Sequence, residues 1–305
     1  MHTPVLLQEA IEGLNIKKDG LYIDATAGEG GHLTEIARLG RKVLGIDQDE
    51  EQIKKLSVIL GSPTLRRTTP ESSLDSGRAS LSLARMTNKI VLVQGNFKDI
   101  EKLAKENNFF PVDGILFDLG LSMYQLKKSG RGFSYKNLAE PLDMRISSAI
   151  ESKASYLINN LEQNELYEIF ARYGEEINSL AISKTVVRAR SLKPIEKVGD
   201  LLQIIDEATG EKDNKTYARI FQALRISVNN ELENLKKVLE GSLKILRKKG
   251  RLVVISFHSL EDRIVKQFIN NNNLKQINKK LIKSTNRSNF ERSAKMRVIS
   301  YEKSI

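Results

Sequence analysis

The chain has 305 residues, enough for one large domain or two ordinary ones, and 40% of them are hydrophobic, which suffices for a packed core. No apolar run approaches the ~18 residues of a membrane span, and Met1 leads almost directly into an amphipathic segment, so we expect neither a membrane helix nor a secretory signal. The net charge of +11 is compatible with a polyanionic partner, and the lack of cysteine excludes disulfides, cysteine-ligated zinc and iron–sulfur sites and fits a cytoplasmic protein.

The first 120 residues alternate short apolar runs with amphipathic stretches. This periodicity predicts strands at 21–24, 42–46, 90–94 and 114–117, and helices at 31–39, 49–60 and about 97–106. Such alternation is typical of a parallel α/β sheet. Residues 61–88 interrupt it with many Ser and Thr residues and two prolines, so we expect a mobile surface loop inserted there.

The pattern changes after residue 125. Successive helices are predicted at 151–160, 163–173, 175–191, 196–208 and 216–248, the last with a break. A buried strand at 251–257 and a helix at 259–270 resume the α/β pattern, and 277–283 could pair with 296–303 as a hairpin. We therefore expect a Rossmann-like α/β domain made of 1–125 and 217–305, with an all-helical domain, 126–216, inserted into it.

The positive charge is concentrated at the C-terminal end. Residues 275–305 hold nine Lys or Arg and two Glu. A strip of this kind can contact a phosphate backbone, or it can be a solubilising tail, and charge alone does not decide between the two.

The segment DATAGEGGH, residues 24–32, lies between the first predicted strand and helix. Gly28, Gly30 and Gly31 allow a sharp turn and a close approach of a ligand to the main chain, and the following helix directs its N–H groups at that ligand. A dinucleotide turn needs a glycine where this chain has Leu33, which disfavours a dehydrogenase. The spacing from Asp24 to the glycines instead looks like the first motif of S-adenosylmethionine (SAM) methyltransferases. A plain tight turn is the alternative.

Further candidates follow the other strands, at the edge where open α/β sheets bind ligands. Asp47 can accept hydrogen bonds from ribose hydroxyls or cap a helix. Phe97 can stack on adenine or pack in the core. Asp118 can accept a hydrogen bond from an amine and so orient its lone pair toward a methyl donor. His258 can contact RNA, handle a proton or be structural.

Several strings resemble one known family. They are HTPVLLQEAIEGL, YIDATAGEGGH, GIDQD, GILFDLGLS, RGFS, PLDMR, YGEE, FQALRI, VNNELE, KGRLVVISFHSLEDRIVK and RSAKMRV. In this order they are similar to the bacterial 16S ribosomal RNA cytosine-N4 methyltransferases, the small subunit methyltransferase H family, over nearly the whole chain. One departure is Ser122-Met123-Tyr124-Gln125, where the family usually has Ser-Ser-Pro-Gln.

The resemblance implies SAM as methyl donor and N4 of a cytidine in the decoding region of 16S rRNA, within the small ribosomal subunit, as acceptor. It implies cofactor contacts from seven residues: Gly30, Gly31, His32, Asp47, Phe97, Asp118 and Gln125. Asp118 is also the candidate for orienting the amine. The inserted domain is implied to help bind substrate, and Asp143, Arg145 and His258 are the candidates on that side. We predict no metal site, and the oligomeric state stays open, with a homodimer as one option.

Two other functions are compatible with the motifs. One is a SAM-dependent methyltransferase for DNA or a protein amide, which the missing Asn/Asp-Pro-Pro-aromatic tetrad at Asp118 disfavours. The other is a non-catalytic RNA-binding factor that keeps the fold. In either methyltransferase reading, carbon 5 of a pyrimidine is excluded as the acceptor, because that chemistry needs a cysteine thiolate.

Overall fold

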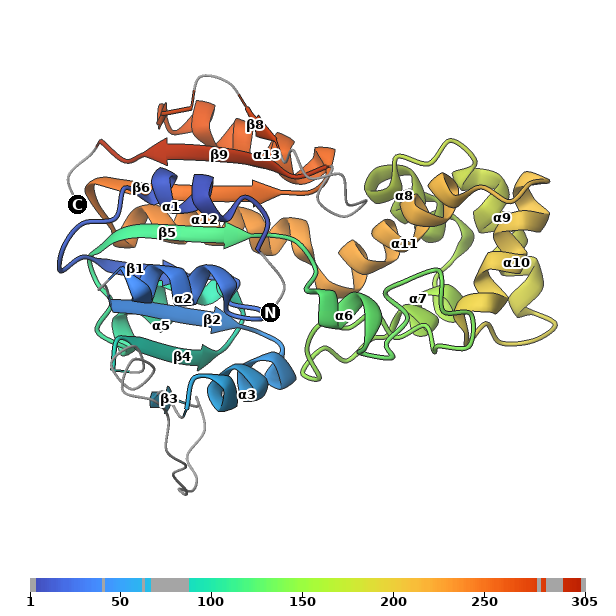
Figure 1. The fold of residues 1–305 in the computed structure, drawn as a ribbon. Coiled ribbons are helices and arrows are strands. Elements are labelled where there is room, and N and C mark those ends of the chain that lie inside the picture. Colours follow the sequence, from blue (N-terminus) through green and yellow to red (C-terminus); the bar gives the residue numbers. More distant parts are fainter. Residues whose placement is uncertain are drawn as a thin grey trace. The chain divides into compact units, whose positions relative to one another are not determined.

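The computed structural model describes residues 4–39, 42–61, 64–66, 88–278, 281–283 and 293–302. Its contacts divide the chain into two compact units, shown in Figure 1. The first unit consists of Met1–Gly120 and Leu232–Ile305, and the second of Leu121–Glu231. The expected boundary at residue 217 falls inside a helix whose buried side chains, Ile220 and Leu224 among them, belong to the core of the second unit.

One nine-stranded sheet forms the centre of the described part of the first unit, in the order β3-β4-β2-β1-β5-β6-β9-β7, with β8 also paired to β9. The pairs from β3 to β6 are parallel, and β9 is antiparallel to its neighbours. The strands are β1 (Leu21–Asp24), β2 (Lys42–Asp47), β3 (Thr64–Arg66), β4 (Ile90–Gln94), β5 (Val112–Asp118), β6 (Leu246–Ser256), β7 (Lys275–Gln276), β8 (Ile282–Lys283) and β9 (Lys295–Ser300).

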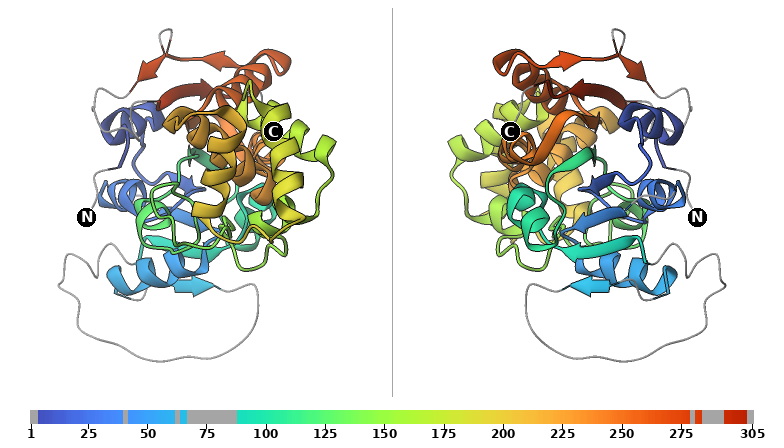
Figure 2. Two further views of the ribbon diagram at one scale, coloured as in Figure 1. Left: turned by 90° about the vertical axis from the view of Figure 1, so that its right-hand side faces the viewer. Right: turned by 90° about the vertical axis from the view of Figure 1, so that its left-hand side faces the viewer.

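Helices cover both faces of this sheet, as Figures 1 and 2 show. They are α1 (Leu7–Leu14), α2 (Gly31–Arg38), α3 (Glu50–Ile59), the 3-10 helix η1 (Phe97–Asp99), α5 (Ile100–Glu106), α12 (Glu231–Ile245) and α13 (Ser259–Asn271). Strand residues alternate between two cores: Ile115 and Phe117 pack with α5, α12 and α13, whereas Leu116 packs with α1, α2 and α3. This period of two, with both faces buried, is the signature of a parallel sheet under helices.

The predicted sheet elements are confirmed, with differences at their ends. β6 begins at Leu246 rather than 251, so the preceding helix ends earlier than the predicted residue 248. The predicted pairing near the C-terminus is present as β8 on β9, with β7 added on the same strand. Within the range predicted as a loop, residues 64–66 form β3, and residues 67–87 lie outside the described residues.

The second unit is helical where it is regular. Its helices are α6 (Met123–Lys127), α7 (Ala154–Asn160), α8 (Gln163–Gly174), α9 (Ser179–Arg190), α10 (Val198–Thr209) and α11 (Asn214–Asn229). The predicted break in the long helix lies at Asn230, which has a left-handed backbone (φ 50°) and separates α11 from α12. A separate core, with Phe170 and Leu142 fully buried, holds this unit together.

The PLDMR segment of the second unit is fastened to α11 by one side chain. Asn229, 3% exposed, donates to the carbonyl of Met144 (2.8 Å) and accepts from the N–H of Ile146 (2.8 Å). Met144 itself has a positive φ of 58° and is fully buried. A non-glycine residue in that region needs support from its surroundings, which these bonds provide.

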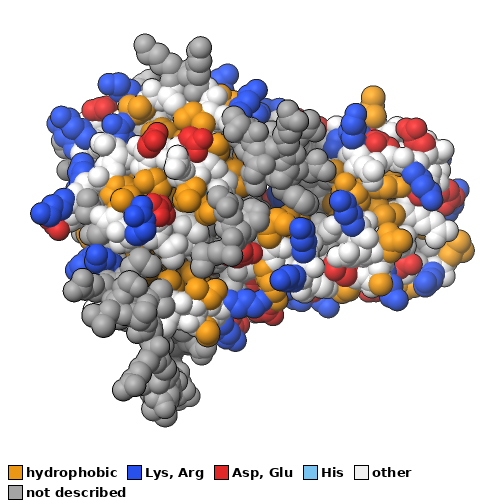
Figure 3. All heavy atoms as spheres, in the orientation of Figure 1, with side chains coloured by type: hydrophobic (Ala, Val, Ile, Leu, Met, Phe, Trp, Pro, Cys, Tyr) orange, Lys and Arg blue, Asp and Glu red, His pale blue; other side chains and the backbone are white. Residues whose placement is uncertain are grey.

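Only part of the basic C-terminal stretch lies among the described residues. Arg297 is 13% exposed and makes two bonds to Asp262 (2.8 and 3.1 Å), and Lys295 lies 4.0 Å from the same carboxylate. On the face shown in Figure 3, Lys and Arg side chains are dispersed over each unit rather than gathered in one patch. Lys279, Lys280, Arg287, Arg292 and Lys303 lie outside the described residues.

No helix in the described ranges combines the length and the apolar character that crossing a membrane requires.

Replacing Asn229 by Ala should lower the free energy of unfolding by about 2–4 kcal/mol, because the buried N–H of Ile146 and carbonyl of Met144 lose their partner. Calorimetric unfolding measures this. Asn160→Ala is the matched control, since Asn160 is exposed and bonds only within its own helix. Equal, small effects of both substitutions would contradict the stabilising role of the Asn229 hydrogen bonds to Met144 and Ile146.

Candidate active site

Three carboxylates meet at the carboxyl edge of the parallel strands. Asp24, Asp47 and Asp118 are the last residues of β1, β2 and β5, which are neighbours in the sheet. Side chains two residues apart on a strand point to the same face of the sheet. Tyr22 and Leu116, two residues before Asp24 and Asp118, are buried on the face covered by α1, α2 and α3. The three side chains therefore share one edge and one face.

Asp24 is the most deeply buried of the three, at 1% exposure. Its Oδ1 accepts from the N–H of Thr26 (3.2 Å), and its Oδ2 has no hydrogen-bond partner among the described residues. Burial, with a smaller contribution from the charges of Asp118 and Asp47, raises the pKa of Asp24 to about 7 against the effect of the Thr26 bond. A buried carboxylate oxygen without a partner indicates a place for a donor or a cation.

Asp47 fastens the glycine turn. Its Oδ2 accepts from the N–H of Gly28 (2.8 Å) and its Oδ1 from the N–H of Asp49 (2.8 Å). Burial raises the pKa of Asp47 to about 6, although these two bonds act against the rise. Asp49, not Asp47, caps α3, by accepting from the N–H of Glu51 (3.1 Å). Each carboxylate oxygen of Asp47 has a second lone pair, so it can still accept a hydroxyl.

Asp118 faces the side chain of His32, which lies in the first turn of α2. His32 Nδ1 lies 3.7 Å from Asp118 Oδ2, and His32 Nε2 lies 3.2 Å from the carbonyl of Val5. Since a carbonyl only accepts, Nε2 carries the hydrogen, and Nδ1 of the neutral ring turns its lone pair toward Asp118. Burial lowers the pKa of His32 to about 4 and raises that of Asp118 to about 7, where the charge of Glu261 also contributes.

The glycines of the turn serve different purposes. Gly28 has a φ of 48° and open space where a Cβ would lie, since the nearest atom, the carbonyl oxygen of Thr26, is 3.8 Å away. Gly30 has a φ of 81°, and a Cβ there would overlap Leu56. The left-handed backbone and the closeness of Leu56 therefore both favour a glycine at position 30, whether or not a ligand is bound.

Phe97 lies at the same edge, three residues after the end of β4. Its ring packs against Phe117 (centroids 6.3 Å apart, planes at 70°), and the side chain is partly exposed. Both predicted roles are thus compatible with its position: one part of the ring belongs to the core and the rest is accessible.

His258 follows the carboxyl end of β6 and precedes α13. Its Nε2 lies 3.1 Å from Glu261 Oε1, and Glu261 also accepts from the N–H of Phe257 (2.7 Å). The acidic partner at this helix start is therefore Glu261, whereas the neighbouring Asp262 is engaged by Arg297.

Three of the predicted residues belong to the second unit. Gln125 is 7% exposed and forms the capping box of α6, with its Oε1 accepting from the N–H of Ser122 (3.0 Å). Asp143 and Arg145 form a two-bond ion pair (2.7 and 2.9 Å), and Arg145 also donates to the carbonyl of Ile150 (3.0 Å). The Arg145 side chain lowers the pKa of Asp143 against the effect of its burial.

The first unit also contains site features that the sequence did not single out. Val5 orients His32 through its carbonyl, and Thr26 Oγ1 accepts from the N–H of Asp118 (2.7 Å). Both residues lie in strings noticed above, HTPVLLQEAIEGL and YIDATAGEGGH, but a backbone carbonyl and a threonine hydroxyl carry no recognisable spacing. Glu261 is a third such feature: its side chain is 3% exposed, and its charge contributes to the raised pKa of Asp118.

The raised pKa of Asp24 makes stability depend on pH. An Asp whose pKa is raised on folding stabilises the fold below its unfolded pKa, and this contribution is lost as pH rises through the folded value, here between about 4 and 7. The lowered pKa of His32 acts in the opposite direction, so a comparison of variants is needed. Relative to Asp24→Asn, the wild type should lose on the order of 3 kcal/mol between pH 5 and 7.

Calorimetric unfolding across that range measures the difference, in which the contribution of His32 cancels because its pKa does not depend on Asp24. Asp19→Asn, at an exposed position whose left-handed backbone Asn tolerates, is the control and should give a difference independent of pH. A pH-independent difference for Asp24→Asn as well would show that Asp24 is ionised throughout.

Comparison with known proteins assigns the family. The model of the MraW methylase family matches residues 1–73 and 69–303. The chain is 38% identical over 307 residues to Ribosomal RNA small subunit methyltransferase H of Dictyoglomus thermophilum, covering 98% of this chain and 96% of that protein. Proteins of the same name from Cytophaga hutchinsonii (39% over 271 residues; 88% and 82% covered) and Clostridium botulinum (41% over 271 residues; 87% and 80% covered) are also similar.

These matches span nearly the whole chain at identities well above those of chance similarity. They confirm the expected α/β methyltransferase fold, enzyme class and methyl donor. The chain therefore belongs to the MraW methylase family and is a SAM-dependent methyltransferase.

Proposed function

We propose that this chain transfers the methyl group of SAM to N4 of a cytidine in the decoding region of 16S rRNA, within the small ribosomal subunit. The observation that carries the proposal is its similarity over 98% of its length to a ribosomal RNA small subunit methyltransferase. The missing cysteine agrees with a nitrogen acceptor rather than pyrimidine carbon 5. We place the enzyme in the cytoplasm, with its ribosomal substrate, and a homodimer is compatible with this proposal.

The sheet edge fits SAM. SAM carries a positive sulfonium and an ammonium group, and the edge presents three carboxylates, one of them with the unpartnered oxygen of Asp24. A cation there would satisfy that oxygen and offset both the burial and the repulsion that raise the pKa of Asp24. We propose that the cofactor contacts come from Gly30, Gly31, His32, Asp47, Phe97, Asp118 and Gln125.

When bound, SAM supplies a methyl group that is already activated for attack. The chain's task is then mainly to position the acceptor, so that the lone pair of N4 points at the methyl carbon. Asp118 suits this task because its carboxylate can accept a hydrogen bond from the N4 amine. The amine loses one proton when the new bond forms, and a carboxylate with a pKa of about 7 can take it near neutral pH.

His32 holds Asp118 in this role. Its Nε2–H is held by the carbonyl of Val5, so that the Nδ1 lone pair faces the Asp118 carboxylate. An acceptor in that position favours the protonated form of Asp118 and thus its readiness to take a proton. We propose this arrangement for the cofactor-bound enzyme as well.

On the substrate side we propose contributions from the second unit and from His258. The ion pair of Asp143 with Arg145, together with the Arg145 bond to Ile150, fixes the loop that follows PLDMR. A loop fixed in this way is a rigid support for recognition of a nucleotide. We therefore propose that Asp143 and Arg145 act as one unit toward the target cytidine.

The proposed function is tested with purified protein, labelled SAM and three acceptors: small subunits that lack the modification, naked 16S rRNA and duplex DNA. Label should enter ribosomal RNA, and digestion to nucleosides should place it in N4-methylcytidine. Label in DNA alone, in protein, or at another position of the base would contradict the proposal.

Asp118→Asn should lower kcat by about 10²-fold or more, because an amide cannot take the amine proton, while the KM for the ribosomal substrate changes little. Asp19→Asn, the same substitution at an exposed site, should leave both constants unchanged. A parallel loss of turnover and of substrate affinity would mean that Asp118 serves binding rather than the transfer step.

A further inference from the structure

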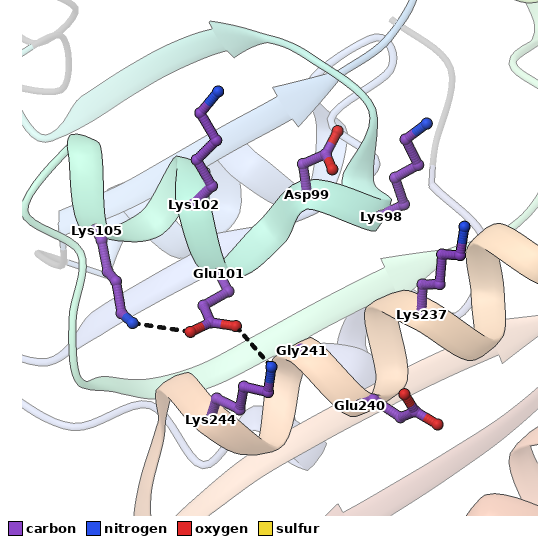
Figure 4. Close-up of a pocket in the computed structure, with 9 residues that line it drawn as sticks. All are labelled: Lys98, Asp99, Glu101, Lys102, Lys105, Lys237, Glu240, Gly241 and Lys244. Atoms are coloured by element: carbon purple, nitrogen blue, oxygen red, sulfur yellow. Dashed lines mark hydrogen bonds and ion pairs between the residues drawn. The ribbon is translucent and has the colours of Figure 1, made fainter.

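A groove with lysine-rich walls lies between η1–α5 and α12 of the first unit (Figure 4). It encloses about 540 Å³. Five lysines and three acidic residues line it together with one glycine: Lys98, Asp99, Glu101, Lys102, Lys105, Lys237, Glu240, Gly241 and Lys244. The groove is separate from the three carboxylates described above, because it opens on the opposite helical layer of the sheet.

The walls of the groove are held at a fixed separation. Helices α5 and α12 approach closely at Gly241, where an added Cβ would lie 3.1 Å from Ile100 Cγ2. Ile100 and the neighbouring Leu239 are fully buried in the shared core. The lysines thus project from a rigid scaffold and not from loops, which favours a preformed binding surface.

At one end of the groove the lysines are paired with carboxylates. Glu101 lies between Lys105 (2.8 Å) and Lys244 (3.0 Å), and Figure 4 shows both pairs as dashed lines. These bonds lower the pKa of Glu101, with Lys105 as the largest contributor. Lys102 lies 3.9 Å from Glu106 of the same helix. This end therefore has little charge left for a ligand.

At the other end of the groove two lysines have no such partner among the described residues. Neither Lys98 nor Lys237 forms an ion pair with any residue that the structure describes, and both side chains are exposed. Figure 4 shows them on opposite walls at the same end of the groove, with Glu240 pointing away from α5. Lys98 directly follows Phe97, so this end lies next to the edge at which β4 ends and the cofactor is proposed to bind.

We propose that Lys98 and Lys237 bind the phosphate backbone of the substrate RNA, at nucleotides that flank the methylated cytidine. The inference rests on the proposed function, which brings RNA to the adjacent sheet edge. Lysine ammonium groups are strongly hydrated point charges that suit mobile phosphates, and backbone contacts of this kind position a nucleic acid without reading its sequence. An acidic protein surface is the alternative occupant, and the experiment separates the two.

The test compares Lys98→Gln/Lys237→Gln with the wild type and with Lys42→Gln/Lys248→Gln. The control removes the same charge from two exposed lysines at the amino ends of β2 and β6, the opposite edge of the sheet. Binding of the full-length protein to naked 16S rRNA and to small subunits lacking the modification is measured by filter retention from 50 to 300 mM salt. Calorimetry with SAM checks that the cofactor site is intact.

The groove variant should bind naked rRNA about 10-fold more weakly near 0.1 M salt, with a slope of log affinity against log salt shallower by about 1.4, as expected for two lost contacts to single-stranded RNA. In the control variant, the loss of affinity and the change in slope should each be less than about half of those in the groove variant. SAM affinity should be the same in all three proteins.

Two results would overturn the inference: a groove variant with the affinity and slope of the control, or a loss confined to assembled subunits with naked rRNA unaffected, which would indicate a ribosomal protein as the partner. Failure of the proposed function is distinguishable, because it appears in the wild type as absent N4-methylcytidine. The RNA affinities of the variants are measured independently of methylation.

Discussion

Burying several carboxylates at one edge of a sheet is unfavourable unless a cationic group or hydrogen-bond donors compensate them. The geometry of this site depends on that constraint. The parallel register brings the ends of β1, β2 and β5 side by side, and the two-residue period turns Asp24, Asp47 and Asp118 to one face. Loss of hydration raises the pKa of all three. The protein thus carries an electrostatic cost at this edge, and a ligand that places a cationic group beside the carboxylates would relieve it.

The surroundings of these carboxylates fix their geometry with main-chain groups. The carbonyl of Val5 sets the tautomer of His32, the N–H of Gly28 holds Asp47, and the Thr26 hydroxyl receives the N–H of Asp118. The segment before α1 is therefore part of the site, although it lies outside the strand–turn–helix unit that usually signals a nucleotide site. Main-chain partners of this kind lose little entropy on binding a side chain, because they have no side-chain rotamers of their own to fix.

Much of the fold could be predicted from the sequence, because buried parallel strands read as short apolar runs and the residues that follow them fall at one edge by topology alone. The less predictable features depend on packing between distant segments. Nothing local reveals that Leu56 requires a glycine at position 30, or that Asp262 is taken by Arg297 and leaves Glu261 to the helix start. The predicted break in the long helical stretch does not by itself tell which core each half faces.

The insertion of the second unit between β5 and α12 also has a consequence for biosynthesis. β5 pairs with β6, yet the residues Leu121–Glu231 are made between them, so the hydrophobic β5 has one unpaired edge until β6 emerges. At roughly 5–20 residues per second that interval lasts on the order of 10 s. An open, apolar edge strand is a site for aggregation. The second unit has a core of its own and is helical where it is regular, and helical domains generally fold quickly. It can therefore fold while the sheet is still incomplete. The nascent chain then exposes the unpaired edge of β5 at that stage, but not a long unfolded insert in addition.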